Sequence, residues 1–227
     1  MRLSVSMNRD EVNIGWAYLA LQLLVLPLLL VTANSFLRLG LTDAELNFTM
    51  FSMEVVLSLV IFRKFLWESA KVFLRNLWRN LRFAVWGFGI YYIGTFLVNM
   101  GTTYLFPAFS NMNDENILTM VRENHTLMSI GLVFFVPLTE ELLYRGLIFG
   151  RIHKKSRWLA YLVSMVSFAA IHVLGYVVEL SVPMLLVSLV QYLPAAFALA
   201  WAYERTDTIW TSILIHMTVN QIAIGLQ

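Results

Sequence analysis

The chain has 227 residues, of which 59% are hydrophobic and 13% are charged, whereas a soluble domain carries about 45–50% apolar and about 25% charged residues. With a mean hydropathy of +0.70, this composition excludes a disordered chain, a coiled coil, a nucleic-acid-binding protein and an ordinary soluble domain. The formal net charge of +2 says little about an acidic partner, and the lack of cysteine excludes disulfides, thiolate metal sites and cysteine catalysis. The composition therefore predicts a protein that is integral to a membrane.

Seven apolar segments follow one another along the chain, and each is long enough to cross about 30 Å of hydrocarbon as a helix. They are Ile14–Phe36, Phe48–Trp67, Phe83–Phe106, Leu127–Gly150, Leu159–Val178, Val182–Tyr203 and Thr208–Leu226. No internal repeat or separate soluble domain interrupts them. The predicted fold is all-α: a single integral-membrane domain over residues 1–227. It is a polytopic helix bundle with about seven transmembrane helices, and eight is the alternative number.

Basic residues gather in alternate connections between these segments. They are Arg2 and Arg9 before the first segment, Arg63, Lys64, Lys71, Arg75, Arg79 and Arg82 between the second and third, and Arg151, Lys154, Lys155 and Arg157 between the fourth and fifth. The loop between the third and fourth segments instead holds Asp114, Glu115 and Glu123 with Arg122. Because Lys and Arg concentrate in cytoplasmic loops, we predict a multi-pass protein of the cell membrane with a cytoplasmic N-terminus and an outward C-terminus.

The stretch Trp67–Asn80, inside the second connection, has apolar residues at helical spacing, namely Val72, Phe73, Leu77 and Trp78. This pattern is typical of an amphipathic helix that lies on the cytoplasmic leaflet. A solvated connector accounts for it equally well, and the sequence leaves both interpretations open.

Charged side chains at the centre of a spanning helix are costly and usually functional. We expect them in three segments only, all within the last hundred residues. The fourth segment holds Glu140, Glu141 and Arg145, the fifth holds His172, and the seventh holds His216 and Asn220. At a rise of about 1.5 Å per residue, Glu140, His172 and His216 all come near the membrane midplane.

Spacing separates the roles of these residues. Glu141 and Arg145 are four residues apart, so they share a helix face and can pair, while Pro137, one turn earlier, loosens the helix. Glu140 is turned about 100° away from Glu141 and is free to face a neighbouring helix. A carboxylate and two imidazoles at one depth can activate water, and hydrogen-bond donors remain for an oxyanion.

Each of these residues also has a structural interpretation. Glu141 and Arg145 can be a structural clasp, a histidine in an apolar helix can be a satisfied core residue, and Asn220 can be an interhelical hydrogen bond. Elsewhere, we expect His125 to be solvated and His153 to belong to the basic fourth-to-fifth loop. It is the combination of residues that indicates a site.

The combination resembles the motifs of a known family. Glu140-Glu141-x-x-x-Arg145, Phe168-x-x-x-His172 and His216-x-x-x-Asn220 look like those of the CPBP family, the CAAX proteases and bacteriocin-processing enzymes that are also called Abi proteins. The likeness covers roughly Val136 to Asn220, so residues 127–227 are the expected catalytic core and residues 1–126 are spans without a signature. The sixth segment departs from the family's usual glycine-spaced pattern, since it has Pro194 followed by alanines.

The resemblance implies an intramembrane, glutamate-dependent endopeptidase that cuts a peptide or membrane-associated substrate near the cytoplasmic face. It implies that Glu140 and His172 activate the attacking water and that His216 and Asn220 stabilise the oxyanion. Glu141 and Arg145 would hold the site together. From the spacing, Phe168 lies one helical turn before His172, so we expect its ring to pack beside the imidazole. The partners implied are the peptide or membrane-protein substrate and the lipid bilayer, with no nucleic acid.

Metal dependence is a separate question. Glu140, His172 and His216 are the residues that would bind zinc in a metallopeptidase version of the site. The sequence has no His-Glu-x-x-His pair and no cysteine, and a water activated by Glu and His needs no metal. We therefore expect no required cofactor, with zinc as the alternative.

Two other classes of function compete with a peptidase. A non-enzymatic bacteriocin-immunity or scaffold protein of the same fold would keep its phenotype when the catalytic residues are replaced. A transporter is disfavoured by the lack of repeat symmetry and by the confinement of the charges to the second half of the chain.

Overall fold

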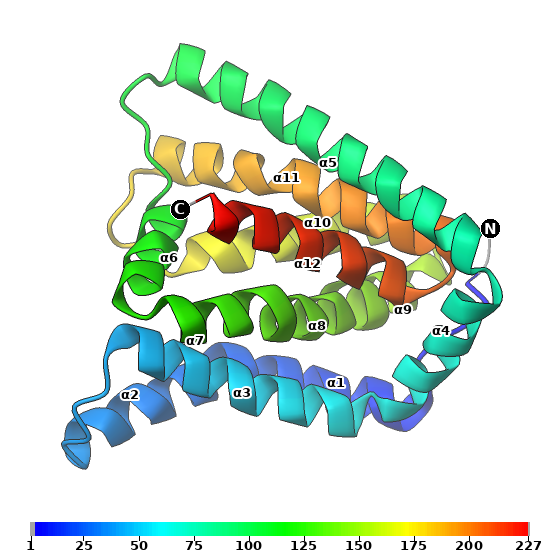
Figure 1. Ribbon diagram of the computed structural model, residues 1–227, viewed down its shortest axis with the longest axis horizontal. Coiled ribbons are helices and arrows are strands. Elements are labelled where there is room, and N and C mark those ends of the chain that lie inside the picture. Colours follow the sequence, from blue (N-terminus) through cyan, green and yellow to red (C-terminus); the bar gives the residue numbers. More distant parts are fainter. Residues whose placement is uncertain (1–2, 227) are drawn as a thin grey trace.

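The computed structural model describes residues 3–226 as a bundle of helices, without a strand in that range, so the all-α prediction is confirmed (Figure 1). The elements are α1 (Arg9–Ala20), the π-helical segment η1 (Leu21–Val25), α2 (Leu26–Phe36), α3 (Asp43–Ile61), α4 (Arg63–Arg75), α5 (Leu77–Leu105), α6 (Met112–Glu123), α7 (His125–Ile130), η2 (Gly131–Phe135, π-helical), α8 (Val136–Glu141), η3 (Leu142–Phe149, π-helical), α9 (Gly150–His153), α10 (Arg157–Leu174), α11 (Val182–Thr206) and α12 (Ile209–Gly225). Several of these elements run on as one continuous helix.

Six continuous helices within the described residues are long and apolar enough to span a membrane. They are Arg9–Phe36, Asp43–Ile61, Leu77–Leu105, His125–His153, Arg157–Leu174 and Val182–Thr206. The seventh predicted segment is α12, a shorter apolar helix of 17 residues. At about 1.5 Å per residue it reaches about 25 Å, so the polytopic prediction of about seven helices agrees with the bundle.

Polar side chains fix where the helices begin. Asn8 accepts from the backbone N–H of Glu11, whose carboxylate accepts from the N–H of Asn8 in return. Thr42 and Glu45 form the same reciprocal capping box at α3. Asn111 caps α6 by accepting from two backbone N–H groups. Each cap satisfies N–H groups that have no carbonyl partner in the first turn.

The second predicted segment ends earlier than expected. The sequence predicted a span to Trp67, but α3 ends at Ile61 and a new helix, α4, begins at Arg63. Phe62, between them, is fully buried, whereas Arg63 and the next lysine are exposed. The chain bends here because the phenyl ring stays in the core and the cations leave it. The fifth segment also ends early, since α10 stops at Leu174 before a run of turns.

Two predicted connections are helical. The stretch Trp67–Asn80 is divided between α4, which ends at Arg75, and α5, which begins at Leu77. Val72, Phe73 and Leu77 are partly buried, whereas Trp78 is 78% exposed. In α4 itself Phe65, Leu66 and Ser69 are buried, so this helix has one side against the bundle. Its position on a membrane leaflet stays a prediction. The acidic third-to-fourth connection, expected as a loop, contains α6, whose Asn113 donates to Tyr192 of α11 and whose Asn116 donates to Tyr176, just after α10.

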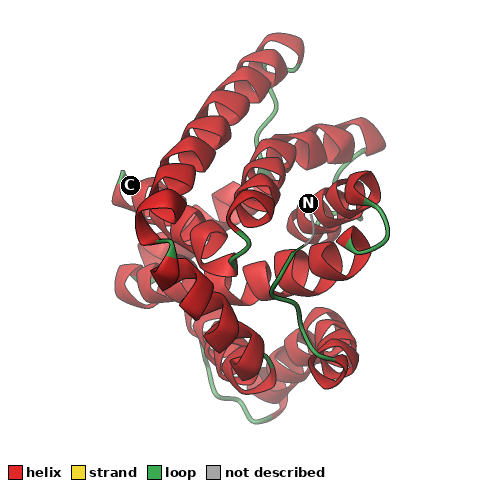
Figure 2. Ribbon diagram, turned by 90° about the vertical axis from the view of Figure 1, so that its right-hand side faces the viewer, coloured by secondary structure: helices red, strands yellow, loops and turns green. Residues whose placement is uncertain are grey.

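The helix from His125 to His153 forms the centre of the bundle. In its most apolar stretch 61% of the residues are buried, against 11–33% in the other candidate spans. Elements α3, α10 and α12 pack against its parts η2, α8 and η3. Figure 2 shows the bundle turned by 90°, as helices joined by loops. Charged residues on this helix are therefore shielded from lipid by protein on most sides.

Small residues let α11 lie close to its neighbours. Ala196, Ala198 and Ala200 are fully buried, and a Cβ placed on Gly94 of α5 would meet the Pro194 Cβ at 2.9 Å. The departure from a glycine-spaced pattern is thus compensated, because alanines on α11 and a glycine on α5 provide the close approach.

The two ends of the bundle differ in charge. The N-terminus, α4 and α9 lie at one end, and α6 and the C-terminus lie at the other (Figure 1). The first end carries the basic connections, including Arg63 and Lys64 on α4 and Lys154 and Lys155 after α9. The second end carries the acidic α6.

Candidate active site

A cavity of about 930 Å³ lies between α3, α5, α6, α10, α11 and α12. Of the predicted site residues, those that line it are Glu140, Phe168, His172, His216 and Asn220. Glu141 and Arg145 lie behind its wall, with fully buried side chains. The cavity reaches the surface at the α6 end, where the exposed residues Asn116 and Thr119 form part of its lining.

Glu141 and Arg145 form the predicted ion pair. Arg145 Nη1 lies 2.8 Å from Glu141 Oε1, and neither side chain has any exposed surface. Arg145 also donates from Nη2 to the Ala196 carbonyl at 3.3 Å and places its guanidinium carbon 4.2 Å from the centre of the Phe168 ring. The arginine thereby connects the central helix to α10 and α11.

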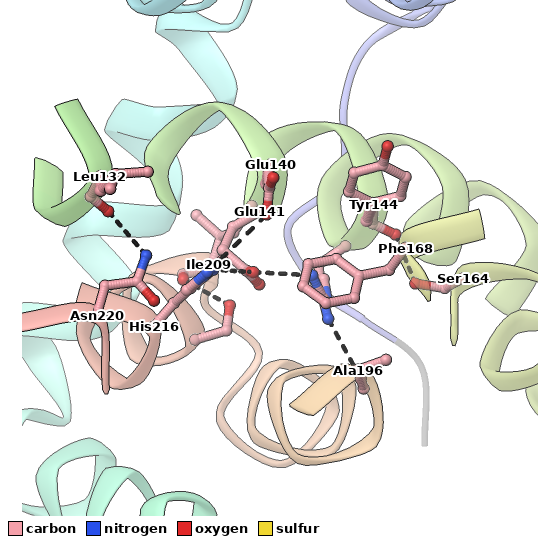
Figure 3. Close-up of polar contacts among 12 residues, drawn as sticks. Leu132, Glu140, Glu141, Tyr144, Ser164, Phe168, Ala196, Ile209, His216 and Asn220 are labelled. Carbon is pink, nitrogen blue, oxygen red and sulfur yellow. Dashed lines mark hydrogen bonds and ion pairs between the residues drawn. The ribbon is translucent and has the colours of Figure 1, made fainter. Parts of the chain in front are cut away.

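His216 lies between the two glutamates, as Figure 3 shows. Its Nδ1 is 3.0 Å from Glu141 Oε1, and its Nε2 is 3.9 Å from Glu140 Oε2. A carboxylate that is already paired with arginine can only accept, so Nδ1 carries the proton and Nε2 is the nitrogen presented to Glu140. Glu140 lines the cavity, and its Oε2 is buried without a hydrogen-bond partner, so no protein donor occupies this oxygen.

His172 is held in a similar way. Its Nδ1 donates to the Phe168 carbonyl at 2.8 Å, because a carbonyl oxygen can only accept. The imidazole centre lies 4.8 Å from that of Phe168, as the spacing predicted, and stacks on Tyr192 of α11 at 4.4 Å. In both histidines Nδ1 therefore bonds to a protein acceptor, while Nε2 makes no hydrogen bond among the described residues.

Asn220 bonds to an unusual turn of the central helix. Its Nδ2 donates to the Leu132 carbonyl at 2.7 Å. In the π-helical segment η2, the N–H of Val136 bonds to the carbonyl five residues earlier. The next N–H in that register would come from position 137 and reach Leu132, but Pro137 has none. Asn220 replaces this missing donor, and its second amide hydrogen remains.

The comparison with known proteins agrees with this arrangement. Residues 122–222 match the model of a family described as type II CAAX prenyl endopeptidase Rce1-like. This segment belongs to the CAAX protease family. The resemblance to the CPBP family is thus confirmed, and the matched CAAX-protease segment contains every site residue predicted from Glu140 to Asn220.

Two curated relatives extend the comparison. An 85-residue stretch, 37% of this chain, is 36% identical to the "UPF0177 protein YxdF" of Lactococcus lactis subsp. lactis (strain IL1403) and covers 41% of it. A 149-residue stretch, 65% of this chain, is 26% identical to the "Putative membrane peptidase YdiL" of Bacillus subtilis (strain 168) and covers 57% of it. The chain therefore spans about half the length of these relatives. No solved structure matches the chain.

A buried charge that lines the cavity lies outside the CAAX-protease segment, where none was expected. This residue is Glu54 of α3, which is 5% exposed. Gln22 of η1, which lines the same cavity, is 7% exposed, and its Oε1 has no hydrogen-bond partner. The expectation that buried charges occur only in the last hundred residues is wrong. The signal was a single glutamate in an apolar run, which no spacing argument connected to the other residues.

A polar cluster at the cavity mouth was also missed. Tyr192 donates to Asp114 at 2.9 Å and accepts from Asn113 at 3.1 Å, and Asn111 donates to Gln191 at 2.8 Å. Burial of the carboxyl group raises the pKa of Asp114 above its ordinary value, while the Tyr192 hydrogen bond and the nearby His172 oppose that rise. These bonds hold α6 across the cavity.

The remaining histidines have other roles. His125 is exposed at the start of α7, as expected. His153, expected in a basic loop, is instead buried, with Nε2 3.0 Å from Glu204 Oε1. Arg157 and Tyr161 bond to the same carboxylate. The loop assignment was wrong because the partner, Glu204, is distant in sequence, and this cluster lies outside the cavity lining.

The donor geometry does not fit zinc. Among residues 3–226, no three carboxylate or imidazole side chains are gathered closely enough to hold a metal ion. Of the alternative ligand set, His216 lies near Glu140, but its Nδ1 is committed to Glu141. These three side chains therefore do not form a zinc site in this arrangement, and independence of catalysis from a metal stays a prediction.

Proposed function

We propose that the protein is an intramembrane endopeptidase that hydrolyses a peptide bond with water activated by Glu140 and His172. One observation carries the proposal: the unpartnered Glu140 Oε2 lies in a cavity that is also lined by two imidazoles whose Nδ1 atoms are held by protein acceptors. A free carboxylate beside oriented imidazoles is an arrangement suited to general acid–base catalysis. The family of the segment 122–222 supports the same reaction.

In the proposed reaction, a water molecule lies between Glu140 and Nε2 of His172. Glu140 takes one proton as the water oxygen bonds to the scissile carbonyl carbon, and the carbonyl oxygen becomes an oxyanion. When the C–N bond breaks, Glu140 gives that proton to the leaving amine, so the carboxylate is regenerated. Atoms and charges balance without a cofactor.

His216 and Asn220 are the proposed oxyanion donors. His216 can donate from Nε2 only as an imidazolium, a form that the carboxylates of Glu140 and Glu141 face from two sides. Asn220 would donate its second amide hydrogen, because the first is taken by Leu132. Donors fixed before the reaction stabilise the developing charge without reorganisation.

The proposed roles of Glu141, Arg145 and Phe168 are to position these groups. Glu141 accepts from both Arg145 and His216 through Oε1, and its side chain is fully buried and outside the cavity lining, so it is not available to a substrate. Phe168 contacts the Arg145 guanidinium and supplies the carbonyl that orients His172. We propose that the substrate is a peptide or a membrane-associated protein in the bilayer. We also propose a cytoplasmic N-terminus, on the basis of the charge at that end of the bundle.

The proposal is tested by comparing the membrane peptidomes of cells that express the wild type or Glu140→Gln. We expect peptides that are present with the wild type and missing with the variant. Glu179→Gln is the matched control, because Glu179 is an exposed glutamate between α10 and α11 that does not line the cavity. Identical peptidomes for the wild type and Glu140→Gln would exclude the peptidase. A phenotype unchanged in Glu140→Gln would instead favour the non-enzymatic immunity or scaffold function.

A further inference from the structure

The cavity is lined by charges of one sign. Its carboxylates are Asp43, Glu54, Asp114, Glu123 and Glu140, while no lysine or arginine in residues 3–226 forms part of its lining. A cleft with charges of one sign and low-dielectric walls concentrates the field and attracts the opposite charge. The two histidines are the neighbouring groups that can become positive.

Glu54 differs from the other buried carboxylates of the bundle. Glu141 is paired with Arg145, and Glu204 accepts from Arg157, His153 and Tyr161. The side chain of Glu54 is 5% exposed and lines the cavity, and it has no hydrogen bond or ion pair within the described residues. Its charged neighbour is another carboxylate, that of Glu140.

A buried carboxylate without a partner costs several kcal/mol. The other buried carboxylates of the bundle have donors: Glu141 and Glu204 are paired with arginines, and Glu11 accepts from the backbone N–H groups of Asn8 and Phe65. At Glu54 the bundle supplies neither, and it adds the unpartnered Oε1 of Gln22, another acceptor that lines the same cavity. Two acceptors without donors indicate that the donor arrives with a ligand.

We propose that Glu54 is the specificity residue of this cavity and binds a cationic side chain, lysine or arginine, of the peptide substrate. This inference rests on the proposed function for the identity of the ligand as a peptide. Glu54 and Glu140 line the same cavity, so the cation is bound in the cavity that also holds the proposed general base. Gln22, whose Oε1 has no hydrogen-bond partner, offers a second acceptor in the lining of this cavity.

Binding of three synthetic peptides tests the proposal. The peptides share one apolar, fluorescently labelled sequence and differ at a single central position, which is lysine, norleucine or glutamate. The protein is held in nanodiscs of phosphatidylcholine, a lipid without net charge, so that the membrane itself does not attract the lysine. Fluorescence anisotropy gives each Kd without requiring cleavage.

With the wild type, we expect the lysine peptide to bind at least about tenfold more tightly than the norleucine peptide. The glutamate peptide is expected to bind most weakly. Glu54→Gln should reduce the lysine preference to near zero, and Glu54→Lys should reverse it in favour of the glutamate peptide. Glu179→Gln should leave all three Kd values unchanged.

Equal Kd values for the lysine and norleucine peptides on the wild type would overturn the proposal, whatever the variants do. A lysine preference that survives Glu54→Gln in folded protein would overturn it as well. The outcome is separable from that of the proposed function. If the wild type prefers the lysine peptide but cleaves none of them, the peptidase fails and the subsite stands. Cleavage of all three with equal Kd values gives the opposite result.

Discussion

His216 Nδ1 lies 3.0 Å from Glu141 Oε1, the same oxygen that accepts from Arg145 at 2.8 Å. One buried carboxylate oxygen thus joins the central helix to an imidazole on α12. The neighbouring glutamate, Glu140, is left without this connection and faces the cavity. Two adjacent residues of one type therefore have different tasks, because the helix turns them in different directions.

Replacement of Arg145 is expected to destabilise the bundle. In Arg145→Ala the Glu141 carboxylate remains fully buried without its cation, and removal of one partner from a buried pair costs about 3–5 kcal/mol. Thermal unfolding in detergent should show a clearly lowered Tm. The exposed Arg75 provides the control, since Arg75→Ala strands no buried charge. A wild-type Tm for Arg145→Ala would refute the structural role of the pair.

Replacement of Glu140 is expected to affect activity and not folding. Glu140→Gln keeps the side-chain shape and loses no hydrogen bond at Oε2, so the Tm should stay close to that of the wild type. Loss of the general base should lower the rate of peptide cleavage by at least about 10²–10⁴-fold. Cleavage assays in proteoliposomes measure this, and substantial residual activity would assign the base to another residue.

The bond from Asn220 to Leu132 allows its structural and catalytic roles to be separated. Asn220→Ala should lower both stability, by about 1–3 kcal/mol for an unsatisfied buried carbonyl, and the cleavage rate, by about 10²-fold for a lost oxyanion donor. Adding Pro137→Ala returns an N–H to the central helix, so the double variant should regain stability.

The cleavage rate of that double variant decides between the two roles of Asn220. If Asn220 is an oxyanion donor, activity stays low although the Tm recovers. Recovery of both would show that the amide acts only as a replacement for the missing proline N–H.

Chelation tests metal independence. Because Glu140 and His172 can activate water without a metal ion, purified protein treated with EDTA or 1,10-phenanthroline should keep its cleavage rate. Addition of zinc after dialysis should not increase the rate. Loss of activity on chelation, restored by zinc, would show that the residues gather around a metal in the active state.

The raised pKa of Asp114 predicts a pH dependence of stability. The folded protein holds a proton on this carboxyl group that the unfolded chain releases near its ordinary value of 3.8. Stability therefore falls as the pH rises from that value through the raised pKa. Asp114→Asn removes this loss, so the Tm of the variant relative to wild type should increase between pH 4 and pH 7. A pH-independent difference in Tm would contradict the direction of the shift.

Local spacing predicted the helices and the pairs within them, because such contacts depend only on helix geometry. The Glu141–Arg145 pair and the packing of Phe168 beside His172 are examples. Contacts between distant segments were missed, since nothing in an apolar run such as that around Glu54 shows which helix faces it. The same holds for His153, whose partner Glu204 is 51 residues away.

The opposite charges at the two ends of the bundle make access to the cavity directional. A cationic peptide that approaches the end with α4 and α9 meets lysines and arginines and is repelled, whereas one that approaches α6 meets carboxylates and is drawn inward. This difference in access between the two ends requires no moving gate. It also weakens as the ionic strength rises, because mobile ions screen the field outside the cavity before they screen it inside.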